Sequence, residues 1–342
     1  MDINDTRVAV VGAGAIGGVV AAGMAKAGWN VELVCKHREI AEKAASVGLH
    51  VLGVKGEAHV PVTGVEDVRG LSGAKDVVFL ATKANDCVSS ATALLPFLKE
   101  AGAVVSLQNG ICEDAIAQVI GPRRVIRCVV SWGATMRGPA ELEVTSRGEF
   151  VIGSFDDQPD GRLDIVRQML ESVETTRISQ NMIGEQYSKL MVNSCINSLG
   201  AITGQELGKI LASRAARDAF IVLIKEAMAV AVAMGMKVEP GGGGKLDFYR
   251  FVAGSGAISN FRRHLLIRLI GFKYRRLRSS SLQSLERGLK TEVDFLNGYI
   301  CDRGREHGVP TPLNDTVVAM IKEIEEGRRR IAPENLGELP VG

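Results

Sequence analysis

Three polar side chains, Lys189, Asn193 and Asn197, recur every four residues in the otherwise apolar segment QYSKLMVNSCINSLGA. Four residues turn an α-helix by about 400°, so these side chains share one helix face. An ammonium and two carboxamides inside an apolar helix need polar partners, because unpaired buried polar groups are costly. A bound polar substrate would provide such partners. A hydrogen-bonding ladder that joins neighbouring helices is the alternative, and the pattern alone leaves both open.

A glycine-rich loop stands near the N-terminus. Gly12, Gly14 and Gly17 have G-x-G-x-x-G spacing, after an apolar β-like run at 8–11 and before a helix-like segment. In dinucleotide-binding folds these glycines serve the tight turn, the approach of the pyrophosphate and the close packing of helix on strand. Phosphates then lie at the helix N-terminus, which favours anions. We expect a dinucleotide site whose loop consists of Gly12, Ala13, Gly14, Ala15, Ile16 and Gly17.

The end of the next β-like run, at 31–35, indicates which dinucleotide binds. An NAD site usually has Asp or Glu there to bind the ribose 2′-hydroxyl. This chain instead has Lys36, His37 and Arg38, and Glu32 lies within the strand. An ammonium and a guanidinium can hold a 2′-phosphate. We therefore expect NADP, bound by Lys36 and Arg38; a merely solvated basic turn is the alternative.

Strand and helix patterns alternate through the N-terminal half. They follow one another at 76–83, 86–99, 103–110 and 113–119. Such alternation predicts a parallel sheet, and ligands of open α/β sheets bind beyond the C-terminal ends of the strands. Lys83 and Asn109 fall at two such ends and are candidate site residues. Ordinary turn chemistry is the alternative, above all for Asn109, because Asn-Gly is a common turn dipeptide.

The pattern becomes helical after about residue 180. Before it, further β-like pieces extend the sheet, partly antiparallel, at 125–131, 141–145, 149–152 and 174–178. After it, helical patterns begin at Met182 and recur at 212–234, 280–305 and 314–330, with a turning connector at 240–244. The predicted fold is α/β: an N-terminal Rossmann-type doubly wound sheet that binds NADP, residues 1–180, followed by an all-α C-terminal domain that binds substrate, residues 181–342.

Length and composition suit a cytoplasmic enzyme of two domains. The chain has 342 residues, of which 46% are hydrophobic, and a formal net charge of +2, which argues against a nucleic-acid-binding surface. We expect no signal peptide, because the first strand begins almost at once, and no membrane span. The six cysteines form no C-x-x-C pair, so neither a disulfide framework nor a metal site is expected.

The sequence resembles the ketopantoate reductase (2-dehydropantoate 2-reductase) family nearly end to end. The resemblance rests on the glycine loop, on LATK at Lys83, on LQNG at Asn109 and on KLMVNSCINSLGA at Lys189. Two later segments add to it, SSLQSLERGLKTEVDFLNGYI from Ser280 and EHGVPTP from Glu306. The most specific elements are the spaced K-x-x-x-N-x-x-x-N and the later S-x-x-Q-…-T-E-x-D-x-x-N-G.

The resemblance implies roles for the candidate residues. Lys189 matches the general acid that protonates the substrate carbonyl oxygen, and Glu292 matches the glutamate that accepts from the substrate hydroxyl. Ser280 matches a contact to the substrate carboxylate. Glu292 as a helix-surface charge, and Ser279, Ser280 or Ser281 as a helix N-cap, are the alternatives. The further implied contacts are Asn193 and Asn197 to the polar groups of the substrate, Asn109 beside cofactor and substrate, and Lys83 as an orienting residue.

The implied activity is the NADPH-dependent reduction of 2-dehydropantoate to pantoate in pantothenate biosynthesis. A reductase of the same fold acting on a different 2-oxo or 3-oxo acid, larger or more anionic, is the alternative, because pocket shape decides such selectivity. A non-catalytic NADP-binding module is disfavoured, since it has no need of Lys189 and Glu292. The expected partner is a small 2-oxo acid rather than nucleic acid, and a homodimer is left open.

The segment 241–278 departs from the family pattern in being long and strongly basic. Its cations are Arg262, Arg263, Arg268, Lys273, Arg275, Arg276 and Arg278, and apolar residues recur at helical spacing at Ile258, Phe261, Leu265, Leu269 and Phe272. This pattern predicts a basic amphipathic helix. A packed helix with a solvated outer face is the plain interpretation. A lid or partner-binding helix that admits a more anionic substrate is the sharper hypothesis; contact with a membrane surface or nucleic acid is weaker.

Overall fold

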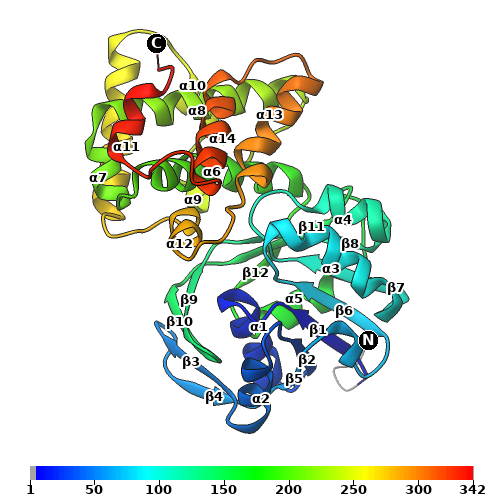
Figure 1. Ribbon diagram of the computed structural model, residues 1–342. Coiled ribbons are helices and arrows are strands. Elements are labelled where there is room, and N and C mark those ends of the chain that lie inside the picture. The colour runs from blue at the N-terminus through cyan, green and yellow to red at the C-terminus, as the bar shows by residue number, and fades with distance from the viewer. Residues whose placement is uncertain (1–4, 342) are drawn as a thin grey trace. The chain divides into compact units, whose positions relative to one another are not determined.

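A computed structural model describes residues 5–341, which form two compact units (Figure 1). The first contains the chain up to Gln108 and Cys112–Met182; the second contains Asn109–Ile111 and the chain from Ile183 onward. The three-residue segment at Asn109 thus belongs by its contacts to the second unit, although the strand before it belongs to the first.

The first unit is built on an eight-stranded sheet of order β12-β11-β8-β7-β6-β1-β2-β5. All neighbouring strands pair in parallel except β11, which runs antiparallel to β8. The strands are β1 (Arg7–Val11), β2 (Asn30–Val34), β5 (Thr63–Val65), β6 (Lys75–Leu80), β7 (Leu98–Ser106), β8 (Val125–Val130), β11 (Phe150–Ser154) and β12 (Thr176–Ile178). The expected Rossmann-type sheet, with antiparallel pairing near its end, is confirmed.

In the part of the chain that the structure describes, five α-helices accompany this sheet: α1 (Ala15–Lys26), α2 (Arg38–Ser46), α3 (Cys87–Leu94), α4 (Glu113–Ile120) and α5 (Leu163–Glu171). The prediction of one helix over 86–99 is wrong at its C-terminal end. The chain passes at Leu95–Phe97 into a 3₁₀ turn that contains Pro96, and β7 already begins at Leu98. Proline lacks the amide hydrogen that an α-helix needs at that position, which accounts for the early end.

A second, four-stranded sheet contradicts one prediction. The order of its strands is β4 (Ala58–Val60), β3 (Leu49–Gly53), β10 (Glu141–Ser146) and β9 (Gly133–Gly138). The β-like run at 141–145 therefore does not extend the main sheet but pairs with β3 and β9. Figure 1 shows the long β9–β10 hairpin beside β3 and β4. Alternating residues predict a strand but do not specify its partner.

The second unit is helical, and no strand follows β12 within the described residues. Its helices are α6 (Met182–Thr203), α7 (Leu207–Ala212), α8 (Arg214–Ala233), α9 (Gly241–Gly244), α10 (Phe248–Val252), α11 (Ala257–Lys273), α12 (Ser280–Glu286), α13 (Asn297–Glu306) and α14 (Pro312–Glu325). Their common core includes Leu190, Leu199, Phe220, Ile224, Ile300 and Val317. None of the helices at residues 5–341 has the length and hydropathy to cross a lipid bilayer.

The helix expected over 212–234 is present as α8, but it begins at Arg214, because Ser213 is its N-cap and its hydroxyl accepts from the amide of Ala216. A second predicted helix is interrupted. The helix expected over 280–305 breaks into α12, a 3₁₀ turn at Val293–Phe295, and α13. The glycine run at α9 turns as expected, because Gly242 and Gly243 have positive φ angles of 61° and 69°.

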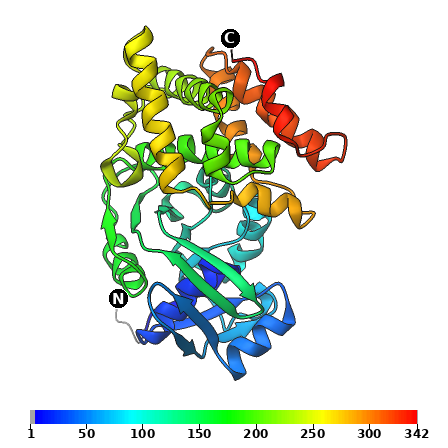
Figure 2. The same ribbon diagram turned by 90° about the vertical axis from the view of Figure 1, so that its left-hand side faces the viewer.

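The basic helix α11 lies on the outside of the helical unit, in yellow in Figure 2. Its cations Arg262 and Arg268 are exposed, as the plain interpretation expects, but the apolar stripe does not pack into the core. Ile258, Phe261 and Phe272 are 79%, 68% and 72% exposed. The buried face is narrow and consists of Arg263, Ile267 and Gly271.

Arg263 is thus structural rather than part of a surface patch. Its guanidinium donates to the backbone carbonyls of Phe251, Val252, Ala253 and Gly254 at 2.7–3.0 Å. These carbonyls at the end of α10 have no intrahelical partners, and an arginine fork can satisfy several of them at once. The sequence alone could not show that Arg263 is buried and structural while its neighbour Arg262 is exposed.

Candidate functional site

The glycine loop follows β1 and meets the ends of two further strands. Gly12 has a φ of +112°, and a Cβ atom there would lie 2.7 Å from the backbone carbonyl of Ala81, just after β6. Its amide donates to the carbonyl of Val34 at the end of β2, at 3.1 Å. Only glycine fits both the backbone angle and the space at this turn.

The other two glycines differ in their surroundings. A Cβ atom on Gly17 would collide with the carbonyl oxygen of Gly12, so glycine is required for α1 to approach β1. A Cβ atom on Gly14 would meet no atom within 4 Å. Gly14 is exposed at the N-cap of α1, and neither a side-chain cap nor an acidic residue occupies the first turn. The half-buried Ala13, Ala15 and Ile16 complete a loop whose amides are open to an anion.

Lys36 and Arg38 are both exposed after β2, but their surroundings differ. Arg38 donates to a carboxylate oxygen of Glu42 at 2.6 Å and lies 3.6 Å from Glu66. Hydrogen bonding to Glu42, followed by the charges of Glu42 and Glu66, raises the pKa of Arg38. Lys36 has no ion pair among the described residues. Of the two, Lys36 has the ammonium that is free to bind an added phosphate.

Glu32 cannot supply the carboxylate of an NAD site. It is buried in β2, where it pairs with Lys75 and accepts from the amide and hydroxyl of Ser72. Burial, followed by the charge of Arg7, lowers the pKa of Lys75. The pair is therefore a structural link inside the sheet, as the sequence pattern indicates.

Lys83 and Asn109 each stand three residues beyond neighbouring parallel strands, Lys83 after β6 and Asn109 after β7. Gln108, which is not among the residues predicted from the sequence, donates to the hydroxyl of Thr82 at 3.0 Å and to the carbonyl of Lys83 at 3.1 Å. The available signal in the sequence was an amide side chain directly after an apolar β-like run. Gln108 fixes the backbone from which the exposed Lys83 side chain extends.

The turn after Asn109 also requires glycine. Gly110 has a φ of +83°, and its Cβ atom would collide with the carbonyl oxygen of Phe295. Ile111 donates its amide to that same oxygen at 3.4 Å. Turn chemistry thus accounts for Gly110, while the half-buried Asn109 side chain remains a candidate contact.

The polar face of α6 is present as predicted. Lys189, Asn193 and Asn197 lie on one uninterrupted helix of 22 residues. Lys189 and Asn193 are half-buried, and Asn197 is 7% exposed. Four apolar residues of the same helix, Leu190, Met191, Cys195 and Leu199, are fully buried in the helical core, and Val192 and Ile196 are partly buried.

A hydrogen-bonding ladder between helices also exists, and it begins at Ser198, the residue after Asn197. Ser198 donates to Asn297 on α13, whose amide nitrogen donates to Asn314 on α14 at 2.9 Å. Asn314 donates in turn to Glu226 on α8 at 2.7 Å. The sequence pattern did not indicate these residues as a ladder. Asn297 belongs to the FLNG motif, which marked it as a residue of interest, but nothing in the sequence indicated a hydrogen bond to Asn314.

The three adjacent serines have separate roles in the structure. Ser279 is the N-cap of α12, where its hydroxyl accepts from the amide of Leu282 at 3.2 Å. Ser280 instead donates to Oδ1 of Asn197 at 3.3 Å. Ser281 is buried. The cap alternative therefore holds for Ser279, and the structure joins Ser280 to the polar face of α6.

Glu292 is not the helix-surface charge of the alternative interpretation. It is 5% exposed and lies in the break between α12 and α13. The neighbouring Thr291 anchors this break, because its amide and hydroxyl both donate to Glu325 on α14, at 2.6 and 2.7 Å. A buried carboxylate in an irregular segment is typical of functional positions.

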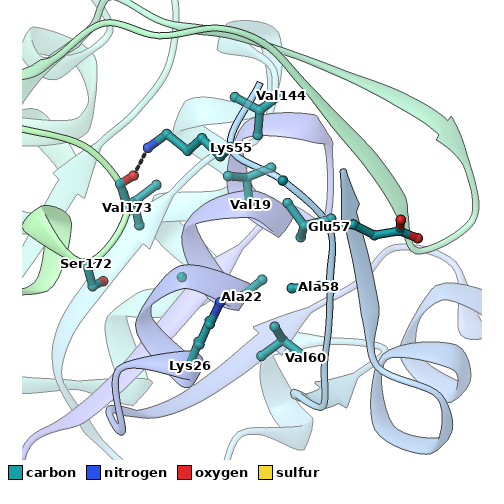
Figure 3. A pocket seen from close by; sticks show the side chains of 13 residues that line it. Val19, Ala22, Lys26, Lys55, Glu57, Ala58, Val60, Val144, Ser172 and Val173 are labelled. Atoms are coloured by element: carbon teal, nitrogen blue, oxygen red, sulfur yellow. Dashed lines mark hydrogen bonds between the residues drawn. The ribbon is translucent and has the colours of Figure 1, made fainter. Parts of the chain in front are cut away.

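A hollow of about 110 Å³ in the first unit is separate from the glycine loop (Figure 3). Its walls are mainly apolar residues of α1 and the small sheet, among them Val19, Val60 and Val144. Figure 3 shows the Lys55 ammonium donating to the carbonyl of Val173, and it also pairs with Glu174. Its small size and apolar walls make it a packing gap rather than a dinucleotide site.

Two family models match the chain. The model described as ketopantoate reductase PanE/ApbA matches residues 8–157, and the model of the ketopantoate reductase PanE/ApbA C terminal matches residues 181–325. The curated 2-dehydropantoate 2-reductase of Archaeoglobus fulgidus is 29% identical over 325 residues, covering 94% of this chain and 98% of the relative. That of Pyrococcus horikoshii is 28% identical, covering 93% and 97%.

Solved structures agree with these matches. A PanE/ApbA family ketopantoate reductase from Ralstonia eutropha superposes with a TM-score of 0.81 at 28% identity, covering 95% of this chain and 100% of the other. A D-mandelate dehydrogenase solved with NADH and anilino(oxo)acetate shares the fold, with a TM-score of 0.79 at 21% identity over 94% and 99% of the chains. The chain therefore belongs to the ketopantoate reductase family of pyridine-nucleotide-dependent oxidoreductases.

Proposed function

We propose that this protein reduces 2-dehydropantoate to pantoate with NADPH, a step of pantothenate biosynthesis. The observation that carries the proposal is the polar face of α6, where Lys189, Asn193 and Asn197 follow one another in a member of this family. Relatives that match nearly the whole chain are named for this reaction, which supports it.

Lys189 is the proposed general acid. Reduction of a 2-oxo acid places negative charge on the former carbonyl oxygen, and an ammonium beside that oxygen stabilises the charge and delivers the proton. Lys189 is half-buried on an otherwise apolar helix, so its charge is only partly screened by water. Glu292, buried in the break before α13, is proposed to accept a hydrogen bond from the substrate hydroxyl.

Ser280 and Asn197 are proposed to bind the substrate together. Oδ1 of Asn197 accepts from Ser280, so the amide hydrogens of Asn197 are left to donate to the substrate. Asn193 makes no side-chain hydrogen bond to another described residue and can bind a second substrate oxygen. These donors suit the carboxylate, the 2-oxo oxygen and the hydroxyl group of the proposed substrate.

The residues of the glycine loop fit a bound dinucleotide. Gly14 leaves open space at the uncapped start of α1, which suits a pyrophosphate, and the unpaired ammonium of Lys36 suits a 2′-phosphate. Bound NADPH supplies the hydride. Arg38 is proposed to assist Lys36, although it must share its guanidinium with Glu42. Lys83 and Asn109 are proposed to orient cofactor or substrate.

The test is NADPH oxidation with 2-dehydropantoate by the wild type, by Lys189→Ala and by Lys225→Ala. Lys225 is an exposed lysine on α8 and serves as the control. We expect kcat to fall by about 10² to 10⁴ in Lys189→Ala, the usual contribution of a general acid, and to be unchanged in the control. Full activity of Lys189→Ala would refute the assignment of the acid.

A different 2-oxo or 3-oxo acid, larger or more anionic, is the second candidate substrate. The observation that favours it is the long segment 248–285, which contains no Asp or Glu. A panel of such acids, measured beside 2-dehydropantoate, decides between the candidates. If another acid has a higher kcat/KM and Lys189 is still required, the proposed mechanism stands and that acid is the substrate.

We infer a cytoplasmic location from the cysteines. All six are buried thiols that form no disulfide within residues 5–341, and burial raises the pKa of the Cys35 thiol to about 11. Free thiols of this kind are typical of proteins in a reducing compartment.

A further inference from the structure

A hollow of about 500 Å³ lies in the helical unit between α7, the end of α11 and the residues that follow α11. Figure 1 shows α7 and α11 near one another at the edge of that unit. Its charged lining residues are Lys209, Arg268, Arg275, Arg276 and Glu206. The hollow contains none of the residues of the proposed reductase site.

Close backbone contacts fix the walls of this hollow. The amide of Gly208 on α7 donates to the carbonyl of Arg275 at 3.2 Å, and the amide of Leu207 donates to the carbonyl of Leu277 at 2.9 Å. A Cβ atom on Gly208 would lie 2.7 Å from Cα of Arg275. The cations after α11 are therefore held against α7 by an ordered backbone.

A second contact brings α11 itself against α7. A Cβ atom on Gly271 would lie 2.7 Å from the Cβ atom of Leu211, so glycine allows the two helices to approach. Arg268 stands one helical turn before Gly271 and faces the same hollow. The pKa of Arg217 is lowered mainly by burial and in addition by the positive charge of Arg268.

The four cations of the hollow have no carboxylate partner among residues 5–341. Nearby ion pairs are formed by other residues: Arg278 pairs with Glu286, and His264 pairs with Asp218. None of the ion pairs among the described residues involves Lys209, Arg268, Arg275 or Arg276. Glu206 is the one acid in the lining. Four cations against one carboxylate create a strongly positive concave surface, and guanidinium groups bind phosphate oxygens in pairs.

We propose that this hollow binds a small molecule carrying a pyrophosphate or similarly multivalent phosphate group. The ring of Phe272, which also lines the hollow, lies beneath the Arg275 guanidinium at 5.6 Å from ring centroid to Cζ and offers an apolar wall to the organic part of such a ligand. The four cations line one open hollow rather than a flat face, which favours a soluble phosphate compound over a lipid surface.

The test measures pyrophosphate binding to the full chain by calorimetry without NADPH, because NADPH carries a pyrophosphate and would compete for the hollow. The test variant is Arg275→Gln with Arg276→Gln. The control is Arg262→Gln with Lys273→Gln, which removes the same charge from exposed positions outside the hollow. We expect the test variant to lose about tenfold or more in affinity and the control to keep its affinity within about twofold. Unchanged affinity in the test variant would assign the binding to the glycine loop and contradict the proposal. Lys209→Gln on α7 provides an independent variant, and it should also weaken binding.

Three further outcomes would overturn the proposal. One is the absence of pyrophosphate binding to the wild type at millimolar concentration. Another is an equal loss in the test and control variants, which would indicate unspecific attraction to a basic segment. The third is binding to vesicles containing anionic lipid but not to pyrophosphate. ATP in place of pyrophosphate shows whether an attached aromatic base adds affinity. Because the two variants differ only in which cations are removed, their comparison does not depend on the proposed reductase activity.

Discussion

The hydroxyl of Ser280 donates to Oδ1 of Asn197 at 3.3 Å, across 83 positions of sequence. This bond fixes the start of α12 on the polar face of α6. It also separates Ser280 from Ser279, whose hydroxyl is occupied by the cap of α12 and by the carbonyl of Asn197 at 3.5 Å. Of the two serines, Ser280 is the one whose side chain meets another candidate site side chain.

Ser280→Ala and Ser279→Ala should therefore fail in different ways. Ser280→Ala should lower kcat/KM by about tenfold through loss of a hydrogen bond to a charged group, with little change in stability. Ser279→Ala should lower the free energy of unfolding by about 1 kcal/mol, as loss of a helix cap does. Steady-state kinetics and urea unfolding of both variants provide the measurement. The reverse pattern would mean that Ser279 contacts the substrate.

Two glycines of the dinucleotide loop should likewise respond differently to alanine. Gly17→Ala should destabilise the protein by about 1 to 3 kcal/mol, because its methyl group would collide with the carbonyl of Gly12. Gly14→Ala should fold normally, since its Cβ meets no atom within 4 Å, but should bind NADPH more weakly by occupying the space that suits a phosphate. Urea unfolding and fluorescence titration with NADPH test the pair. Unchanged NADPH affinity in Gly14→Ala would place the pyrophosphate elsewhere.

The cofactor preference should depend on Lys36 more than on Arg38. Lys36 is unpaired among the described residues, whereas Arg38 pairs with Glu42. Lys36→Ala should raise the KM for NADPH by about tenfold and leave the KM for NADH unchanged. Arg38→Ala should have a smaller effect. Lys26→Ala, an exposed lysine at the end of α1, is the control. Equal effects of Lys36→Ala on both cofactors would exclude a 2′-phosphate contact.

Local chemistry explains which parts of the fold could be predicted. Within one strand–loop–helix unit, Gly12 is required by its φ of +112° and Gly17 by its approach to the carbonyl of Gly12, so the glycine spacing predicts that unit directly. The partner of β10 and the exposed orientation of the Phe261 and Phe272 stripe depend on distant segments. A periodic pattern predicts that a helix has an apolar face, but not that this face is packed.

The candidate site shows the same division. Lys189, Asn193 and Asn197 follow helical spacing and were found from sequence, and Ser280 was found by resemblance. Gln108 could not be predicted, because its role consists of the two hydrogen bonds that it donates to Thr82 and Lys83. Such partners become visible only when the neighbouring strands are placed side by side.

The buried ladder from Ser198 through Asn297 and Asn314 to Glu226 joins α6, α13, α14 and α8, and it should contribute strongly to stability. Asn297 and Asn314 have no exposed surface. Asn297→Ala removes a partner of Ser198 and of Asn314 at once, and each unsatisfied buried group costs about 1 to 3 kcal/mol. We expect its free energy of unfolding to fall by several kcal/mol in urea.

A double-mutant cycle separates this ladder from the loss of packing. Asn314→Ala alone should also destabilise the protein, because it leaves Asn297 and Glu226 short of a partner. The double variant should lose clearly less than the sum of the two single losses, since neither alanine leaves the other asparagine unsatisfied. Strictly additive losses would show that the Asn297–Asn314 bond contributes no coupling. Asn260→Ala, on the exposed face of α11, is the surface comparison. It removes one hydrogen bond, which Asn260 accepts from Arg263 at 2.7 Å, so it should lower the free energy of unfolding less than Asn297→Ala does.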